Sequence, residues 1–409
     1  MIKIPDNQRV VITGLGVISS LGIGWEEFWR NLLKGTSGIS KVTAFDTSEY
    51  KNHYAGEIRN FEADKFIPKR KIARIGRTAQ YAVAVSKMAV KDAKLTLQEL
   101  KSRNVGVCLG TTMGEPQVME NLDAHCYLEG ERYIVDWLSA MKYPASSIAD
   151  NVAVMLNLNK HTMVFGNACA AGNYAVGYAT DIIKAGRAQM MLAGGVDSLS
   201  HIAFTGFNRL LVMAPDMCRP FDKDRKGMIL GEGAGVMVLE SLQSALRRKA
   251  PIYAEILGCG CSCDAGHMTH PSVSGIAKAI AQSLKNSHIA PEKVDYICAH
   301  GTGTPENDKA ECQAIKNVFG GRSKEIPISS IKSMLGHSMG AASALELINC
   351  CLAIKHNKIP PTINWETKDP QCDIDCVPNV AREVEVNIAL NNASAFGGNN
   401  ACVGLGECE

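Results

Sequence analysis

The chain has 409 residues, of which 46% are hydrophobic and 21% are charged. With only 15 prolines, this composition is typical of a well-packed globular protein and excludes extended disorder. The 43 basic and 41 acidic side chains leave a net charge of +2, which gives no overall field for nucleic acid or an anionic membrane.

Strands and helices alternate along the first 250 residues. Short β-branched runs that end in glycine are typical of buried parallel strands, and helical segments rich in small residues follow them. The pattern predicts strands at 10–15, 105–109, 162–165, 189–193 and 235–239, and a helix at about 170–184.

The same alternation returns in the rest of the chain. It predicts strands at 252–257, 294–299, 326–329 and 387–391, and helices at 275–287, 308–319 and 341–354. Two such series indicate an α/β protein built from two stacked units, residues 1–250 and 251–409, with parallel-dominated sheets. No proline- or serine-rich linker separates the units, so we expect them to share one core.

The fifteen cysteines lie mostly in apolar runs rather than at the spacings of a disulfide framework. No secretory signal precedes the first predicted strand, so we expect reduced thiols in a cytoplasmic protein. The tightest group, Cys259, Cys261 and Cys263, is interpreted as a strand with alternating cysteines rather than as a metal site. No apolar run reaches 18 residues, which predicts no membrane-spanning helix.

The segment GNACAAG at 166–172 joins a predicted strand to a predicted helix through small residues. Cys169 therefore stands where a helix begins, and the free N–H groups and dipole of the first turn stabilise a thiolate. We expect a lowered thiol pKa, an accessible sulfur and room for a substrate carbonyl. A buried structural cysteine is the alternative.

Three later motifs also combine polar side chains with glycine. His300 ends a predicted strand before GTGTP, and His337 ends the segment KSMLGH. In FGGNN at 396–400, two glycines allow the backbone to approach a ligand closely. Taken singly, each histidine also fits a structural role.

The order of these motifs is specific. TGLGVISSLG, ACAAG, RPFDKDRKG with GEGAG, AHGTGTPENDKAE, IKSMLGHSMGAA and AFGGNN resemble the type II β-ketoacyl-acyl-carrier-protein synthases over essentially the whole chain. The resemblance implies a dimeric protein with a thiolase-like fold, in which αβαβα layers are duplicated within one chain. The nucleophile would lie in the half 1–250 and the two histidines in the half 251–409.

The resemblance implies an acyltransferase of fatty acid or polyketide chain elongation. Cys169 would hold the acyl chain during decarboxylative Claisen condensation with a malonyl-type carrier thioester. His300 and His337 would hydrogen-bond the malonyl thioester. Lys332 matches the family lysine near the second histidine, Glu311 matches the glutamate that pairs with the region of that lysine, and both would order the site. A surface ion pair is the alternative for these last two residues.

Further contacts follow from the same resemblance. The backbone N–H groups of Cys169 and Phe396 would form the oxyanion hole, and Phe396 would also gate acyl access. The pantetheine arm would contact Thr269, Thr302 and Thr304, and the acyl pocket would include Met113, Phe207 and Met228. The substrates arrive on the phosphopantetheine of acyl carrier protein, so no other cofactor is expected.

The closing motif departs from the family pattern NSFGFGGTN. Here it is NASAFGGNN, in which Ser394, Ala395 and Asn399 replace a phenylalanine, a glycine and a threonine. These changes put ordinary saturated fatty-acid elongation in doubt and admit a polyketide or polyene intermediate.

An acidic carrier would need a local basic patch. A cluster within thirteen residues supplies one, with a solvated helix face as the alternative: Lys65, Lys69, Arg70, Lys71, Arg74 and Arg77.

Both a homodimer and a heterodimer with a chain-length-factor-like subunit fit the sequence. A non-catalytic subunit would generally lack the nucleophile, so Cys169 counts against that reading. A thiolase would add a second reactive cysteine, for which Cys402 is a candidate, but two histidines favour the synthase. His337 also disfavours a Cys-His-Asn starter enzyme.

Overall fold

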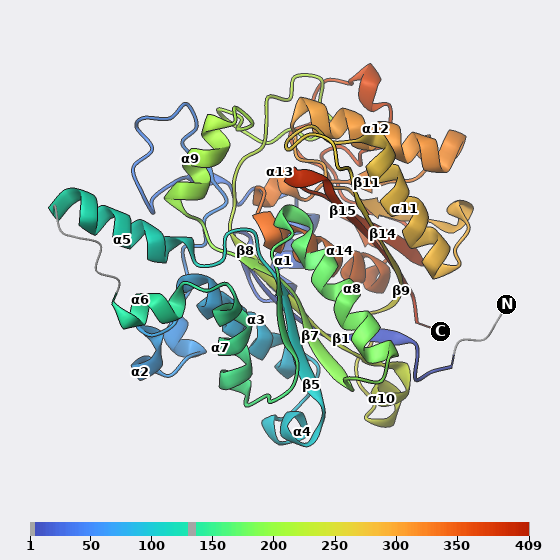
Figure 1. The fold of residues 1–409 in the computed structure, drawn as a ribbon. Coiled ribbons are helices and arrows are strands. Elements are labelled where there is room, and N and C mark those ends of the chain that lie inside the picture. The colour runs from blue at the N-terminus through green and yellow to red at the C-terminus, as the bar shows by residue number, and fades with distance from the viewer. Residues whose placement is uncertain (1–4, 130–135, 409) are drawn as a thin grey trace.

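The structure, a computed structural model, describes residues 5–129 and 136–408 (Figure 1). Its centre is a mixed sheet with the strand order β11-β10-β14-β15-β9-β1-β8-β7-β5-β6, and β2 pairs with β1 at one side. The strands are β1 (Val10–Ser19), β2 (Gly22–Ile23), β5 (Val105–Gly110), β6 (Thr162–Phe165), β7 (Met190–Asp197), β8 (Gly233–Ser241), β9 (Ala254–Cys263), β10 (Tyr296–Cys298), β11 (Ile328–Ser329), β14 (Ile388–Ser394) and β15 (Asn399–Gly406).

The two halves of the chain repeat one topology. The main strands are β1, β5, β6, β7 and β8 in the first half and β9, β10, β11, β14 and β15 in the second. Numbered within its half, each set has the order third, second, fourth, fifth, first. Pairings between the first three strands in this order are parallel and the other two are antiparallel, in both halves.

The prediction of parallel-dominated sheets is therefore wrong. Half of the pairings within each repeat are antiparallel. In the second half, for example, β14 and β15 are joined by a short turn at 395–398, and so short a connection can only reverse the chain.

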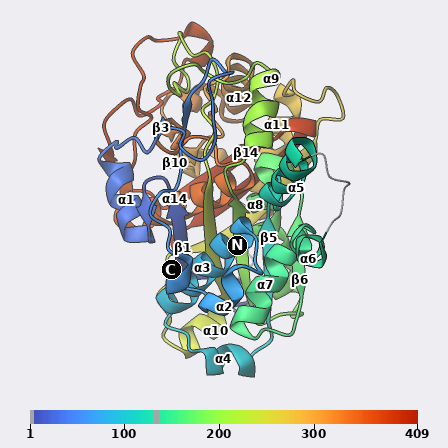
Figure 2. The same ribbon diagram turned by 90° about the vertical axis from the view of Figure 1, so that its left-hand side faces the viewer.

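Helices form three layers around the two parts of the sheet (Figures 1 and 2). Two helices lie between the parts, because each contacts strands of both halves, and others cover the outer faces. The inner helices are α8 (Ala171–Lys184) and α14 (Ala342–His356), and the outer ones include α3 (Arg77–Asp92), α7 (Ser146–Leu156), α11 (Val273–Ser287) and α12 (Pro305–Phe319). The expected duplicated αβαβα layering is confirmed.

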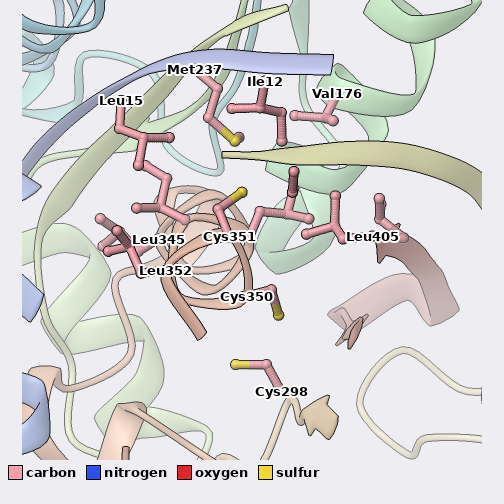
Figure 3. Close-up of a cluster of buried hydrophobic side chains, with 14 of the residues drawn as sticks. Ile12, Leu15, Val176, Met237, Cys298, Leu345, Cys350, Cys351, Leu352 and Leu405 are labelled. Carbon is pink, nitrogen blue, oxygen red and sulfur yellow. The ribbon is translucent and has the colours of Figure 1, made fainter. Parts of the chain in front are cut away.

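The main core lies where α14 meets the sheet (Figure 3). Leu345 and Cys351 of α14 pack with Ile12 of β1 and Met237 of β8, and all four side chains are buried. Residues 342–354 are buried on every side of α14, including the polar Ser343, Glu346 and Asn349, as expected for a helix in the interior of the protein. This buried helix fixes the His337 segment, which directly precedes it, against the nucleophile half.

Every predicted strand and helix is present with shifted ends, but β15 was not predicted. Its sequence, NNACVGLG, is rich in asparagine and glycine, which are depleted in strands. Pairing with β14 on one side and β9 on the other holds it in the sheet.

Cys169 and most other cysteines whose side chains the structure describes are free thiols, and most are buried. Cys259, Cys261 and Cys263 alternate along β9, as predicted, with the last two exposed. Within residues 5–129 and 136–408, no group of three or more histidine, cysteine or acidic side chains is arranged to hold a metal ion. Over the same ranges, no helix is both long and apolar enough to cross a membrane.

Candidate active site

Cys169 lies in the short turn that connects β6 to α8. The turn is a 3₁₀ helix over Ala168–Ala170, and Ala168 has a φ of 47°, in the left-handed region. The cysteine is 6% exposed and borders a cavity. Small neighbours are required because a Cβ on Gly172 would lie 2.7 Å from Ser343 Oγ at the start of α14. The strand-turn-helix placement predicted for Cys169 is therefore present.

The electrostatic expectation for this thiol is wrong. Burial raises the pKa of Cys169 to about 12, and the positive charge of Lys332 opposes this rise only in part. The resting group is thus a neutral thiol, which must lose its proton as it attacks a substrate.

His300 and His337 meet on the same cavity as Cys169. Their ring centroids are 5.4 Å apart and their planes are nearly perpendicular. Burial and the nearby charge of Lys332 hold the pKa of each imidazole well below its usual range. Both rings are therefore neutral at physiological pH.

Neighbouring groups select the same tautomer for both rings. The N–H of Met339 donates to Nδ1 of His337 at 3.2 Å, and Nζ of Lys332 lies 3.4 Å from Nδ1 of His300. A lysine ammonium and a backbone N–H can only donate hydrogen bonds, so Nδ1 is the acceptor in both rings. Each proton consequently lies on Nε2, which leaves two N–H donors for a ligand.

Glu311 holds the main chain at His300. Its carboxylate accepts hydrogen bonds from the N–H groups of His300 at 2.7 Å and Gly301 at 2.8 Å, and from the Asn392 side chain. The group is completely buried, and burial raises its pKa. Glu311 supports the site, as predicted, but it is not the partner of Lys332.

The partner of Lys332 is Glu346 of α14, which the sequence analysis did not identify. The two side chains form a buried ion pair, and Lys332 is 1% exposed. Burial raises the pKa of Glu346 to about 7, while Lys332 acts in the opposite direction. The alternative of a surface ion pair at Lys332 and Glu311 is thus wrong, because both residues are buried.

Two buried aspartates that the sequence analysis missed also order the cavity. Asp308 accepts from the N–H groups of Thr302 and Phe221, at 3.0 and 2.9 Å. Asp197, at the end of β7, ties the turn at 111–113 to the N–H of Gly340 at 2.6 Å. The sequence did carry a signal for Asp197, because GGVD places a carboxylate at the end of a buried strand.

The cavity has a volume of about 320 Å³. It brings together most of the predicted substrate contacts: Cys169, Phe207, Met228, Thr269, His300, Thr302, Thr304, His337 and Phe396. The hydroxyls of Thr302 and Thr304 are 2.8 Å apart. Met113 does not line this cavity but packs in an adjoining cluster with Phe204 and Met339.

Phe396 lies at the turn between β14 and β15. Its ring centroid is 6.1 Å from that of Phe207, so two aromatic side chains stand together on the cavity wall. Gly397 and Gly398 follow with φ values of 82° and 76°, which only glycine adopts readily. Cys402 is fully buried in β15 and does not border the cavity.

The basic cluster lies on the surface around α2 (Lys69–Ile72). Lys65 and Lys69 pair with Glu62 and Asp64, at 2.8 and 3.7 Å. Arg77 lies 3.8 Å from Glu232. Among the described residues, the remaining cations of the cluster form no ion pair: Arg70, Lys71 and Arg74.

Comparisons with known proteins identify the family. Residues 7–245 match the N-terminal domain of beta-ketoacyl synthases and residues 253–366 match the C-terminal domain. The chain is 40% identical over 404 residues to a 3-oxoacyl-[acyl-carrier-protein] synthase 2 of Staphylococcus aureus, covering 97% of both chains.

Two solved structures share the fold. The structure titled "The ishigamide ketosynthase/chain length factor" is 46% identical, with a TM-score of 0.95 over 98% of this chain and 99% of that one. A chain of a second structure, titled as a type II PKS acyl-carrier protein in complex with its ketosynthase, is 33% identical, with a TM-score of 0.90 over 98% of this chain and 99% of that one. The chain therefore belongs to the beta-ketoacyl synthase family.

Proposed function

We propose that the protein condenses an acyl chain, held on Cys169, with a malonyl-type acyl-carrier thioester and releases carbon dioxide. The observation that carries this proposal is the pair of neutral imidazoles, each with its proton on Nε2, on the same cavity as the buried thiol. Carboxylates in these positions would repel the enolate that decarboxylation forms.

The first step acylates the enzyme. Sγ of Cys169 attacks the acyl thioester carbonyl, the carbon–sulfur bond to pantetheine breaks, and the thiol proton passes to the leaving pantetheine sulfur. The backbone N–H groups of Cys169 and Phe396 would stabilise the tetrahedral oxyanion. This role is supported by the position of both residues on the cavity wall.

The second step generates the nucleophilic carbon. The bond between the malonyl carboxylate and the α-carbon breaks, its electron pair forms the thioester enolate, and carbon dioxide leaves. The Nε2–H groups of His300 and His337 would donate to the enolate oxygen, and each such donor lowers the barrier by about 3–4 kcal/mol.

The third step joins the two units. The α-carbon attacks the acyl carbonyl on Cys169, the carbon–sulfur bond breaks, and the sulfur leaves as a thiolate that takes up a proton from solvent. The product is a β-ketoacyl thioester on the carrier. Thr269, Thr302 and Thr304 would contact the pantetheine arm of the carrier. This arm is the only prosthetic group that the proposed reaction needs.

The partner of the reaction would be acyl carrier protein, bound at the basic cluster around α2. The positive charges of Arg70, Lys71 and Arg74, which form no ion pair among the described residues, support this placement.

The free cysteines support a reducing, cytoplasmic location.

The protein would act as a dimer, with itself or with a chain-length-factor-like subunit. Strand β6 supports this, because in the described chain it pairs on one side only, and Met163 on it is 41% exposed. An open strand edge with exposed apolar side chains is a surface that proteins normally cover.

The pathway is tested by product analysis. The replacements at Ser394, Ala395 and Asn399 favour a polyketide or polyene intermediate over a saturated fatty acyl chain. Mass spectrometry of carrier-bound products from saturated and polyunsaturated primers of equal length would decide. Faster extension of the unsaturated primer supports the polyene reading, and a preference for the saturated one contradicts it.

A further inference from the structure

The hydroxyl of Ser394 is buried on the cavity wall without a partner. Ser394 is 5% exposed and lines the cavity beside Ala395 and Phe396. Its Oγ forms no hydrogen bond with any of the residues that the structure describes. Buried polar groups without partners are rare in folded proteins and need an explanation. A ligand in the cavity can supply the missing partner.

Alternation along β14 shows which side of the cavity this hydroxyl faces. Asn391 donates to Asn173 of α8, so the odd-numbered face of β14 looks toward the nucleophile helix. Asn392 donates to Glu311, so the even-numbered face looks toward the carboxylate that holds His300. Ser394 is two residues beyond Asn392 and shares its face. The hydroxyl therefore lies on the histidine side of the cavity.

We propose that Oγ–H of Ser394 donates a hydrogen bond to the carboxylate of the malonyl-type substrate. This inference rests on the proposed function and names the group that binds its second substrate. In that substrate the carboxylate is two bonds from the thioester carbonyl that the histidines bind. The hydroxyls of Thr302 and Thr304 form a hydrogen bond with each other, and Lys332 forms an ion pair with Glu346. The hydroxyl of Ser394 has no hydrogen-bond partner among the described residues.

A neutral donor suits a carboxylate that must leave. By holding the carboxylate in place, the hydroxyl can keep the carbon–carbon bond that breaks perpendicular to the plane of the thioester group. When the bond breaks, its electron pair passes to the enolate, carbon dioxide departs, and Ser394 neither gains nor loses a proton. A full positive charge at this position would hold the carboxylate and oppose its loss. Ser394 thus binds and orients the substrate.

The experiment isolates the malonyl half-reaction. Cys169→Ala protein serves as the parent, and decarboxylation of a malonyl-pantetheine thioester is followed by carbon dioxide release. Adding Ser394→Ala should raise KM about tenfold, because a hydrogen bond to a charged group is lost. Ser394→Thr, which keeps the hydroxyl, should stay within about twofold of the parent, a change too small to signal a lost hydrogen bond.

A matched control and a second substrate separate this role from packing. Ser86 of α3 also has a buried hydroxyl without a described partner, but it lies outside the cavity, so Ser86→Ala should leave KM unchanged. With Cys169 intact, Ser394→Ala should lose much less with an acyl-pantetheine thioester than with the malonyl one, since the acyl substrate has no carboxylate.

The outcomes distinguish this inference from the proposed function. A parent that releases no carbon dioxide contradicts the proposed function itself. A parent that does, together with an unchanged KM in Ser394→Ala, overturns only the role of Ser394. Equal losses with malonyl and acyl substrates also overturn it. If Ser394→Ala fails to fold, Ser394→Cys keeps the shape with a weaker donor and should still raise KM for the malonyl substrate.

Discussion

The ammonium group of Lys332 lies 3.4 Å from Nδ1 of His300. This contact fixes the proton of His300 on Nε2, and the charge helps keep the ring neutral. Lys332 can occupy a buried position because Glu346 neutralises it. The histidine that handles the enolate thus depends on an ion pair whose acidic member belongs to the central helix α14.

Breaking this ion pair should destabilise the protein strongly. Lys332→Met leaves the buried Glu346 without its partner, and such a change costs about 3–5 kcal/mol. The control is Lys324→Met, which removes a surface pair with Asp373 and should cost far less than the buried change. Urea unfolding of the two variants measures both values. Equal small losses would contradict the importance given to the Lys332–Glu346 pair.

Each histidine should be needed for decarboxylation but not for acylation. His300→Ala and His337→Ala each remove one donor to the enolate and should slow release of carbon dioxide by about 10²–10³. Mass spectrometry should still find acyl groups on Cys169 in both variants. Full decarboxylation by either variant would remove that histidine from the mechanism.

The pH dependence should show that both imidazoles work in the neutral form. The pKa of each ring is well below 6.5, so neither ring gains a proton as the pH falls from 7.5 to 6. Decarboxylation of a malonyl-pantetheine thioester by Cys169→Ala protein should therefore show no step from the rings over this range; a step near pH 7 would belong to Glu346, whose pKa is about 7, and should be absent in Glu346→Gln. A loss of rate with a midpoint near 6.5, the ordinary histidine value, would mean that the rings titrate like exposed histidines.

In the unfolded protein, His300 and His337 do gain protons as the pH falls, so the free energy of unfolding depends on pH. Below about pH 6.5 the unfolded histidines bind protons that the folded ones do not, which lowers stability, whereas buried carboxyls such as Glu346, with a pKa of about 7, bind protons in the folded state and raise it. The histidine contribution is isolated by comparison with His337→Ala, whose urea midpoint should fall less between pH 7.5 and 5.5 than that of the wild type; equal changes would contradict the burial of a neutral ring at His337.

Carrier recognition should depend on the uncommitted cations of the basic cluster. Reversing Arg70 and Arg74 to glutamate should raise KM for acyl-carrier substrates and flatten its salt dependence, because rim charges steer association. A pantetheine thioester should react as before. Lys101→Glu, an exposed change on α4 (Leu97–Ser102), is the control. No loss for the carrier would place docking elsewhere or on a partner subunit.

Short-range patterns predicted most of this architecture. Alternating apolar runs marked every main strand except β15, whose asparagines and glycines are stabilised only by neighbours distant in sequence. The same limit applies to Glu346, which stands in an apolar helix and reveals its role only when α14 packs against Lys332. Sequence could place Cys169 at a helix start, but the depth of burial that raises its pKa is a property of the whole fold.

The cavity shows a similar division. The resemblance supplied Cys169, His300, His337 and Phe396, and the structure brings all four to one cavity. Met113 packs beside Phe207 in a separate cluster, and its place in the acyl pocket stays a prediction. Asp308 was missed because an aspartate in a helix carries no signal until the backbone amides that it binds are folded around it, whereas Asp197 did carry a signal, its place at the end of a buried strand.

The central claim is that Cys169 carries the acyl chain and passes it to the malonyl unit. Protein incubated with an acyl-carrier thioester, digested and analysed by mass spectrometry should carry the acyl mass on the peptide that contains Cys169. Addition of a malonyl-carrier thioester should then discharge that adduct and yield a β-ketoacyl carrier two carbons longer. An adduct on another cysteine, or condensation at the wild-type rate by Cys169→Ala, would contradict the account.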